Sequence, residues 1–156
     1  MGRERPMPRI EIILPDKFVF TTTIPIRIGD INRGSHVSNV NLMAIIEEAR
    51  AQFLCGCGYA DVVNVKAGLG FIMGDVGIIY KNQITYGKQV ITQIAAADFK
   101  NKSFDLVFEL TDNVTGEEVA RAKTGMLLFD YRQQEVIPLP EEMKNRLANG
   151  LLFTNT

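Results

Sequence analysis

The sequence predicts an α+β domain in which one long helix packs against a mainly antiparallel sheet. Three observations lead to this class: an alternating segment at residues 18–28, a helical segment that follows it, and four consecutive strand-like segments after the helix. The 156 residues, of which 46% are hydrophobic, suit a single domain with a sizeable core. The one long helix must then be covered by the one sheet.

The first strand is expected from Phe18 to Ile28. Its even positions are Phe, Phe, Thr, Ile, Ile and Ile, whereas its odd positions are Val, Thr, Thr, Pro and Arg. This period of two indicates a strand with one buried face. Pro25 falls on the polar side, where it is tolerated best at or near the edge of a sheet.

The long helix is expected from Val40 to about Cys55, since this stretch contains no Gly or Pro before Gly56 and Gly58. Ser38 or Asn39 can cap it. Its main apolar stripe consists of Leu42, Ile45, Ile46, Ala49 and Phe53. A second apolar flank predicts burial over most of the circumference; it consists of Val40, Ala44, Ala51 and Leu54. The clearly polar stripe consists of Asn41, Glu48 and Gln52, with Cys55 beside them.

The remaining strands are expected at residues 70–83, 89–99, 103–111 and 118–130, with a short piece near Val136. Turn residues at 112–116 and a short polar connection at 100–102 join consecutive strands so closely that they should pair antiparallel. Pro140, followed by two glutamates, opens a short C-terminal helix over residues 140–148. Residues 1–16 are expected to form an N-terminal extension of a single domain that spans residues 1–156.

Composition excludes several classes of function. The formal charge is −1, from 17 Lys and Arg against 18 Asp and Glu, so a nucleic-acid partner is not expected. Pro15 and Asp16 end the N-terminal apolar patch too early for a signal peptide, and no run approaches the about 20 residues that span a bilayer. The protein is therefore expected to be cytoplasmic, without a membrane partner.

No cofactor or metal is expected either. Cys55 and Cys57 are the only cysteines, and two such close thiols make neither a disulfide framework nor a metal site without further ligands. The chain has one histidine, His36, which excludes a histidine-based zinc centre.

The turn GDINRGSHVSN, residues 29–39, concentrates polar side chains between the first strand and the long helix. The first turn of a helix offers unpaired N–H donors and the positive end of a dipole, which suit a developing oxyanion. The turn can therefore hold a polar group or a substrate carbonyl. A structural alternative remains open: His36 can be a structural hydrogen-bonding residue, while Ser35, Ser38 and Asn39 cap the helix and the glycines supply the bend.

Glu47 is the unusual acid of the helix, because it lies on the second apolar flank whereas Glu48 lies on the polar stripe. An ion pair with Arg50, three residues on, is one explanation. The other is a carboxylate held in a cleft as a base or nucleophile. The pattern of residues leaves both open.

Several motifs resemble those of one enzyme family. The segment RIGDINRGSHVSNVNLMAIIEEAR, residues 27–50, resembles a signature with an acidic pair before Gly-His-Val-Asn-Asn and a helix that ends in a Glu-rich, Arg-containing stretch. IIYKNQITYG, TGEEVARAKTGMLLFD and IPLPEEMKNRL resemble the later strands and the ending. On these motifs, residues 18–147 resemble the hotdog-fold acyl-CoA thioesterases related to 4-hydroxybenzoyl-CoA thioesterase.

The resemblance implies a hotdog fold, in which the sheet wraps the long helix and the active sites lie between two protomers of a homodimer or homotetramer. It places the oxyanion-polarising backbone amide at Asn39 and aligns the family's helix carboxylate with Glu47. His36 and Asn32 would orient substrate or water. Candidate substrate-binding residues are Asp30, Ser35, Ser38 and Tyr80.

The sequence departs from the family pattern at three places in these motifs. The position four residues before His36 is commonly the catalytic aspartate, and here it is Asn32, which can neither attack as a nucleophile nor remove a proton from water. Asp30 aligns with the family's earlier acidic position. The usual glycine before the histidine is Ser35, and the aspartate that often follows Tyr-Gly is Lys88.

The leading hypothesis is hydrolysis of an acyl-CoA or acyl-carrier-protein thioester to free acid and thiol, with coenzyme A as part of the substrate. The alternative is a non-catalytic hotdog protein that binds an acyl-CoA-type ligand, which the loss of an acid at Asn32 motivates. A hotdog dehydratase is disfavoured, because Val-Ser-Asn stands where that group has a proline-rich loop after the histidine.

Overall fold

The computed structural model describes residues 8–64 and 68–150. Within them the chain forms six strands, three α-helices and one short 3₁₀ helix. In chain order these are β1 (Phe20–Pro25), η1 (Ile28–Asp30), α1 (Asn39–Gly56), α2 (Ala60–Asn64), β2 (Leu69–Tyr80), β3 (Gln89–Ala97), β4 (Ser103–Asp112), β5 (Glu118–Asp130), β6 (Glu135–Val136) and α3 (Glu141–Asn149). Residues 1–7 of the expected N-terminal extension lie outside the described residues.

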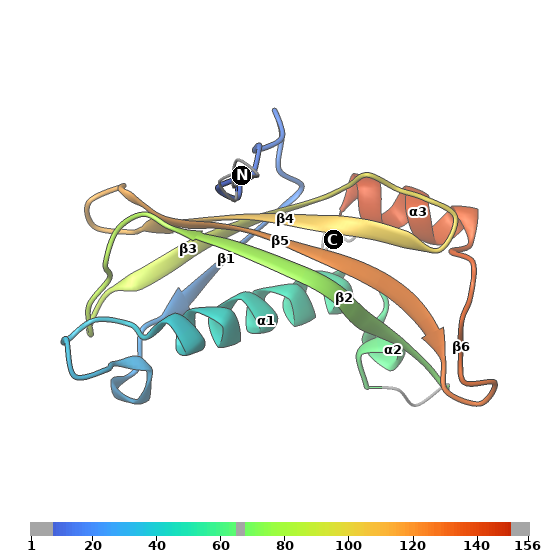
Figure 1. Ribbon diagram of the computed structural model, residues 1–156, viewed down its shortest axis with the longest axis horizontal. Helices are drawn as coiled ribbons and strands as arrows, with labels where there is room; N and C mark the ends of the chain where they lie inside the picture. Colours follow the sequence, from blue (N-terminus) through green and yellow to red (C-terminus); the bar gives the residue numbers. More distant parts are fainter. Residues whose placement is uncertain (1–7, 65–67, 151–156) are drawn as a thin grey trace, which may run out of the picture.

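The strands form one antiparallel sheet in the order β1-β3-β4-β5-β2, and β6 pairs with the end of β5. The sheet curls, and α1 lies in its concave side (Figure 1). The expected class, one long helix covered by a mainly antiparallel sheet, is confirmed. Both β1 and β2 are edge strands within the described residues, which agrees with the polar-side position of Pro25.

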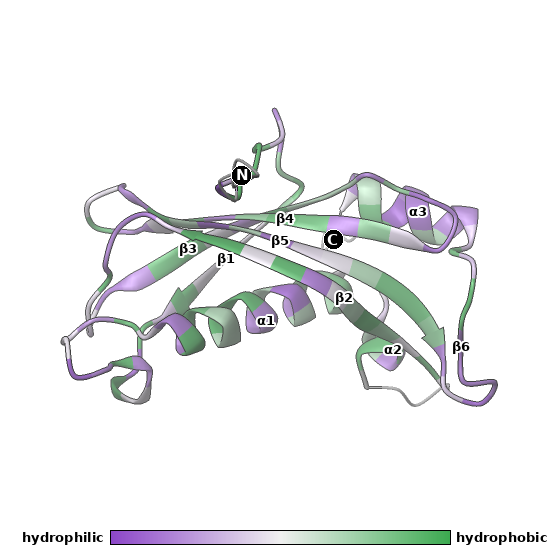
Figure 2. Ribbon diagram, viewed as in Figure 1, coloured by the Kyte–Doolittle hydropathy of each residue, from purple (hydrophilic) through white to green (hydrophobic). Residues whose placement is uncertain are grey.

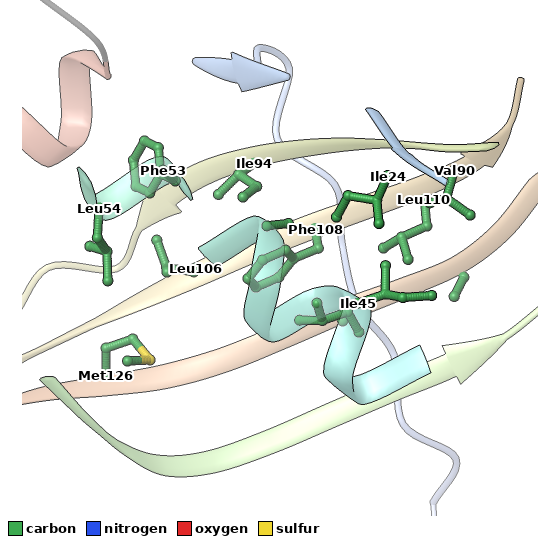
Figure 3. Packing of buried hydrophobic residues seen from close by; sticks show 14 of the residues in the cluster. Ile24, Ile45, Phe53, Leu54, Val90, Ile94, Leu106, Phe108, Leu110 and Met126 are labelled. Atoms are coloured by element: carbon green, nitrogen blue, oxygen red, sulfur yellow. The ribbon is translucent and has the colours of Figure 1, made fainter. Parts of the chain in front are cut away.

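The core lies between α1 and the concave side of the sheet. In β4, alternate residues are fully buried and face the helix; these are Phe104, Leu106, Phe108 and Leu110. The main helix stripe that the sequence predicted is buried against them, and Figure 3 shows Ile45 of α1 facing Phe108. Burial of such a side chain stabilises the fold by about 1.5–3 kcal/mol.

The second apolar flank of α1 differs from its prediction. Leu54 is buried, but Val40 is 80% exposed and Ala44 is also exposed. The expectation of burial over most of the helix is therefore wrong for the single chain, because one sheet covers only one side of a helix. Figure 2 shows apolar and polar residues alternating along α1 rather than a helix that is apolar throughout.

Two strand ends differ from the sequence prediction for local reasons. β1 ends at Pro25 rather than Ile28, since the following residues turn into η1, where the Asp30 N–H donates to Arg27 O at 3.0 Å. β2 ends at Tyr80 rather than Gln83, because the N–H groups of Lys81 and Asn82 both donate to Val119 O. The short helices η1 and α2 were not predicted.

The convex side of the sheet carries charged side chains and the N-terminal segment. Residues 8–17 run over this side (Figure 1), where Ile12 is buried and its carbonyl accepts from Nη1 of Arg121 at 3.3 Å. At the end of the sheet, α3 is held by Arg146, which donates to Cys57 O at 3.3 Å and lies 5.5 Å from the ring centroid of Tyr59. Within the described residues, neither the N-terminal segment nor α3 covers the N-terminal half of α1.

Candidate active site

The polar turn between β1 and α1 is a compact loop closed by backbone hydrogen bonds. The Asn32 N–H donates to His36 O at 3.0 Å, and the Ser35 N–H donates to Asn32 O at 3.1 Å. Oδ1 of Asn32 accepts from the Gly34 N–H at 2.8 Å. Ser35 stands in the left-handed region with φ 64°, which explains why glycine suits this position. Asn32 and Ser35 thus shape the turn that presents His36.

Gly34 leaves room for the His36 side chain and has no unusual φ angle. A Cβ added there would lie 2.9 Å from Nε2 of His36 and 3.2 Å from Oδ1 of Asn32. The imidazole therefore lies directly against the turn. Nδ1 of His36 is 3.1 Å from Val37 O, so the tautomer with a proton on Nδ1 donates to that carbonyl and leaves Nε2 as an acceptor.

Asp30 fastens this turn to the helix. Its carboxylate is 2% exposed and accepts from the Arg27 N–H at 2.8 Å and from Nδ2 of Asn41 at 3.3 Å. Burial alone would raise the pKa of this carboxyl, but the hydrogen bonds from Arg27 and Asn41 outweigh it and lower the pKa below its ordinary value. Asp30 therefore stays ionised and lies inside the turn.

The N-terminus of α1 presents free backbone donors beside this turn. Ser38 is the N-cap: its Oγ accepts from the Asn41 N–H at 3.0 Å, and its own N–H donates to Asp30 O at 3.0 Å. The N–H groups of Asn39 and Val40 have no acceptor within residues 8–64 and 68–150. Such donors at the positive end of a helix dipole attract a negative or partly negative oxygen.

A cleft of about 230 Å³ opens at this end of the helix and is called the α1 cleft below. His36, Asn39 and Leu42 line one wall, and the opposite wall is the end of β2 with the segment after it, residues 80–84. The hydroxyl of Tyr80, which is 50% exposed, donates to Asn39 O at 3.4 Å. Three predicted site residues, His36, Asn39 and Tyr80, therefore meet at one cleft.

Glu47 lies apart from the α1 cleft. It is eight residues beyond Asn39 on the same helix (47 − 39), which is about 12 Å along the axis. Its side chain is 54% exposed, and its Oε1 lies 3.5 Å from Nη2 of Arg50. The ion pair that the spacing suggested is therefore present, and Glu47 is accessible to a ligand at the same time.

A second, smaller pocket of about 100 Å³ adjoins Glu47 and is called the Glu47 pocket. Glu47 and Arg50 form its rim. Its apolar lining comes from three elements: Ala51 and Leu54 of α1, Val62 and Val63 of α2, and Phe71 of β2. A carboxylate thus stands at the mouth of an apolar recess.

Sequence reasoning missed the part played by Asn41. Its side chain bonds to Asp30, to Gly29 O at 3.3 Å and to Oγ of Ser38 at 2.7 Å, and so ties the turn to the helix. The available signal was position: Asn41 is three residues after the N-cap, where a polar side chain commonly reaches back to the cap.

The described residues contain no group of three or more His, Cys, Asp or Glu side chains placed to hold a metal ion. No helix in the described part of the chain is long and apolar enough to cross a membrane. The absence of a metal or cofactor remains a prediction of the sequence.

Comparison with known proteins gives one family. The sequence model of the Thioesterase-like superfamily matches residues 26–147, which include the turn, α1 and the whole sheet from β2 to β6. No match is found among curated proteins.

Solved structures share the fold at low sequence identity. The 1,4-dihydroxy-2-naphthoyl-CoA thioesterase from Synechocystis superposes with a TM-score of 0.74 and 15% identity, covering 82% of this chain and 94% of that one. A gentisyl-coenzyme A thioesterase superposes with a TM-score of 0.74 and 19% identity, and the match covers 83% of this chain and 100% of that one. The 12:0-ACP thioesterase from Umbellularia californica superposes with a TM-score of 0.71 and 17% identity, and the match covers 91% of this chain and 57% of that one. The hotdog fold implied by the sequence motifs is thereby confirmed.

Proposed function

The chain belongs to the Thioesterase-like superfamily, and from this premise we propose that it hydrolyses the thioester of an acyl-CoA or acyl-carrier-protein conjugate to a free acid and a thiol. The observation that carries the proposal is the unpaired N–H group of Asn39, a residue that lines the α1 cleft. A thioester carbonyl gains negative charge on oxygen as water adds to its carbon. Fixed donors at that oxygen stabilise the transition state.

The proposed reaction assigns a role to each group. The Asn39 N–H donates to the carbonyl oxygen, and the Glu47 carboxylate takes a proton from a water molecule whose oxygen bonds to the carbonyl carbon. The C–S bond then breaks, the carboxylic acid is released, and the thiolate takes the proton that Glu47 holds. His36 and Asn32 orient the substrate or the water. Direct attack by Glu47 through an anhydride is the variant of this scheme.

The separation of Glu47 and Asn39 requires a second copy of the chain. Within one chain these groups lie about 12 Å apart along α1, too far to act on the same carbonyl. α1 runs antiparallel to β2: Tyr80 contacts Asn39 at one end, and Arg50 Nη1 lies 3.8 Å from Met73 Sδ toward the other. A two-fold axis that pairs the β2 strands of two copies antiparallel would therefore also place their α1 helices antiparallel to each other.

We propose that two copies pair through their β2 edges. In the described residues β2 bonds only to β5, and the middle of its free edge is exposed at Met73 and Val76. Such an edge is a ready template for another strand. Antiparallel pairing about the middle of β2 brings the Glu47 end of one helix beside the Asn39 end of the other. The homodimer, alone or within a homotetramer, and the cytoplasmic location remain predictions.

The non-catalytic alternative has one observation in its favour. The family's usual aspartate is Asn32 here, and its Oδ1 is already used by the Gly34 N–H. A chain that lacks any working base would bind an acyl-CoA-type ligand without cleaving it. In that case Glu47 would serve only as the partner of Arg50.

Release of free thiol from a panel of acyl-CoAs tests the proposal. Glu47→Gln should lower kcat at least about 100-fold, since a general base contributes roughly 10²–10⁴-fold. Glu48→Gln is the matched control, because the adjacent Glu48 bonds to Gln52 at 2.8 Å on the other side of the helix; it should change kcat less than about threefold. Binding of acyl-CoA without turnover in the native chain would favour the alternative.

A further inference from the structure

The Glu47 pocket differs in chemistry from the α1 cleft. Polar side chains reach into the α1 cleft from His36, Lys81 and Asn82, which suits the amide-containing arm of a CoA or acyl-carrier thioester. The Glu47 pocket has only apolar walls behind its charged rim. Of the two, the Glu47 pocket is the one suited to a hydrocarbon group.

One part of the wall of the Glu47 pocket, Phe71, belongs to a chain of packed aromatic rings. Phe71 packs edge-on against Phe104, with centroids 5.6 Å apart, and Phe104 stacks on Phe99 at 5.8 Å. Tyr59 packs on the other side of Phe71 at 6.3 Å. Because Phe104 is fully buried, the Phe71 ring cannot move toward the core. Phe71 is therefore a fixed part of the pocket wall.

The volume limits what the pocket can take. An apolar cavity of about 150 Å³ takes the six carbons of a benzene ring, so in proportion a pocket of about 100 Å³ holds about four carbon atoms. Size thus favours a short aliphatic group over an aromatic or long one.

We propose that the Glu47 pocket binds the acyl group of the substrate and that the preferred substrate is a short-chain acyl thioester of about four carbons. This rests on the proposed function: Glu47 at the rim places the scissile carbon there, and the acyl chain points into the recess. Phe71, as a fixed part of the wall, limits chain length. Ala51, on the same face of α1, limits the width.

The test measures kcat/KM for thiol release and, in parallel, binding by calorimetry, with acetyl-, butanoyl-, octanoyl- and benzoyl-CoA. The native chain should prefer butanoyl- over octanoyl- and benzoyl-CoA at least about tenfold, the effect of a few misplaced methylenes in an apolar pocket. Phe71→Ala should move the optimum toward octanoyl-CoA. Ala51→Leu should fill the pocket and lower the ratio of butanoyl to acetyl turnover about tenfold.

Phe20→Ala is the matched control for Phe71→Ala. Phe20 is also a half-buried ring in an edge strand, and it packs on the fully buried Phe53 at the same centroid distance of 5.6 Å, but away from the Glu47 pocket. It should leave the chain-length profile unchanged even if it lowers stability. Ala51→Leu keeps the test decisive if Phe71→Ala fails to fold, because leucine is a good helix former.

The outcomes separate this inference from the proposed function. Turnover that is highest with octanoyl- or benzoyl-CoA, or a profile that neither variant moves, would overturn the inference and leave hydrolysis standing. No turnover of any thioester would overturn the proposed function. The calorimetric series then decides the inference: butanoyl-CoA binding at least about tenfold tighter than octanoyl-CoA supports the pocket, and equal affinities overturn it.

Discussion

Asn39 and Glu47 stand on the same helix but cannot reach the same atom. Eight residues separate them, about 12 Å along the axis, and each borders a different hollow: Asn39 the α1 cleft and Glu47 the Glu47 pocket. A single chain thus holds the proposed oxyanion donor and the proposed base, which are both accessible but too far apart to cooperate.

Ser35→Gly should stabilise the protein. Ser35 has φ 64°, a left-handed conformation that costs a residue with a side chain roughly 1 kcal/mol relative to glycine. The free energy of unfolding in urea should rise by about 0.5–1 kcal/mol, with thiol release unchanged within twofold. A loss of stability would mean that the Ser35 side chain makes a contact that outweighs the strain.

Asn32→Asp should keep both the fold and the activity. The aspartate can accept from the Gly34 N–H as Oδ1 of Asn32 does at 2.8 Å, and it adds a carboxylate near His36. Thiol release should stay level or rise, because in the proposed reaction Glu47 already supplies the base. Activity that appears only in Asn32→Asp would show that the native chain binds but does not cleave. Asn32→Ala, which removes the acceptor, should cost about 1 kcal/mol of stability.

Asp30→Asn should destabilise the protein at neutral pH by about 1–3 kcal/mol, because the Arg27 and Asn41 donors lose a charged acceptor. The folded protein holds the pKa of Asp30 below its ordinary value, so this stabilisation is present above the unfolded-state pKa of about 3.9 and is lost as pH falls through the folded-state pKa. In urea titrations, the difference in the free energy of unfolding between the native protein and the variant should be smaller at pH 3 than at pH 7. Asp16→Asn, an exposed position, is the control.

Glu109→Gln should flatten the pH dependence of stability. A hydrogen bond to Glu118 raises the pKa of Glu109 to about 7, helped by burial and by the charge of Glu118. The folded protein therefore holds a proton that the unfolded chain releases above about pH 4.3, so native stability falls between about pH 4.3 and 7. In the variant the glutamine amide donates an N–H to Glu118 at every pH, so this hydrogen bond no longer depends on protonation of a carboxyl group. Glu117→Gln, at an exposed site, should behave like the native chain in thermal unfolding across this range.

The elements with strong local patterns could be predicted from the sequence. The alternation before Pro25 and the stretch without Gly or Pro after Ser38 specified β1 and α1 to within a few residues. Pairing of β2 with β5 could not be predicted, because it depends on contacts between residues as distant as Ile78 and Ala122. The exposure of Val40 could not be predicted either, since periodicity shows which side of a helix is apolar but not what covers it.

The sequence predicted which residues belong to the candidate site better than it predicted how they are arranged. The polar turn and the helix N-terminus placed His36 and Asn39 at one cleft, as their spacing indicated. Local sequence could not reveal that Asp30 points inward to Arg27 and Asn41, because that depends on how η1 folds back. Nor could it reveal that Glu47 borders a pocket that Phe71 of a different element also lines.

Mixing two inactive variants tests the central claim most directly. Glu47→Gln removes the proposed base, and Asn39→Pro removes the proposed donor at the first helical position, where proline is well tolerated. If Glu47 of one copy acts with Asn39 of the other, each mixed dimer holds one intact site. Unfolding and refolding the two variants together at equal amounts should then restore about a quarter of the native thiol release. A mixture as inactive as either variant alone would contradict a site shared between two chains.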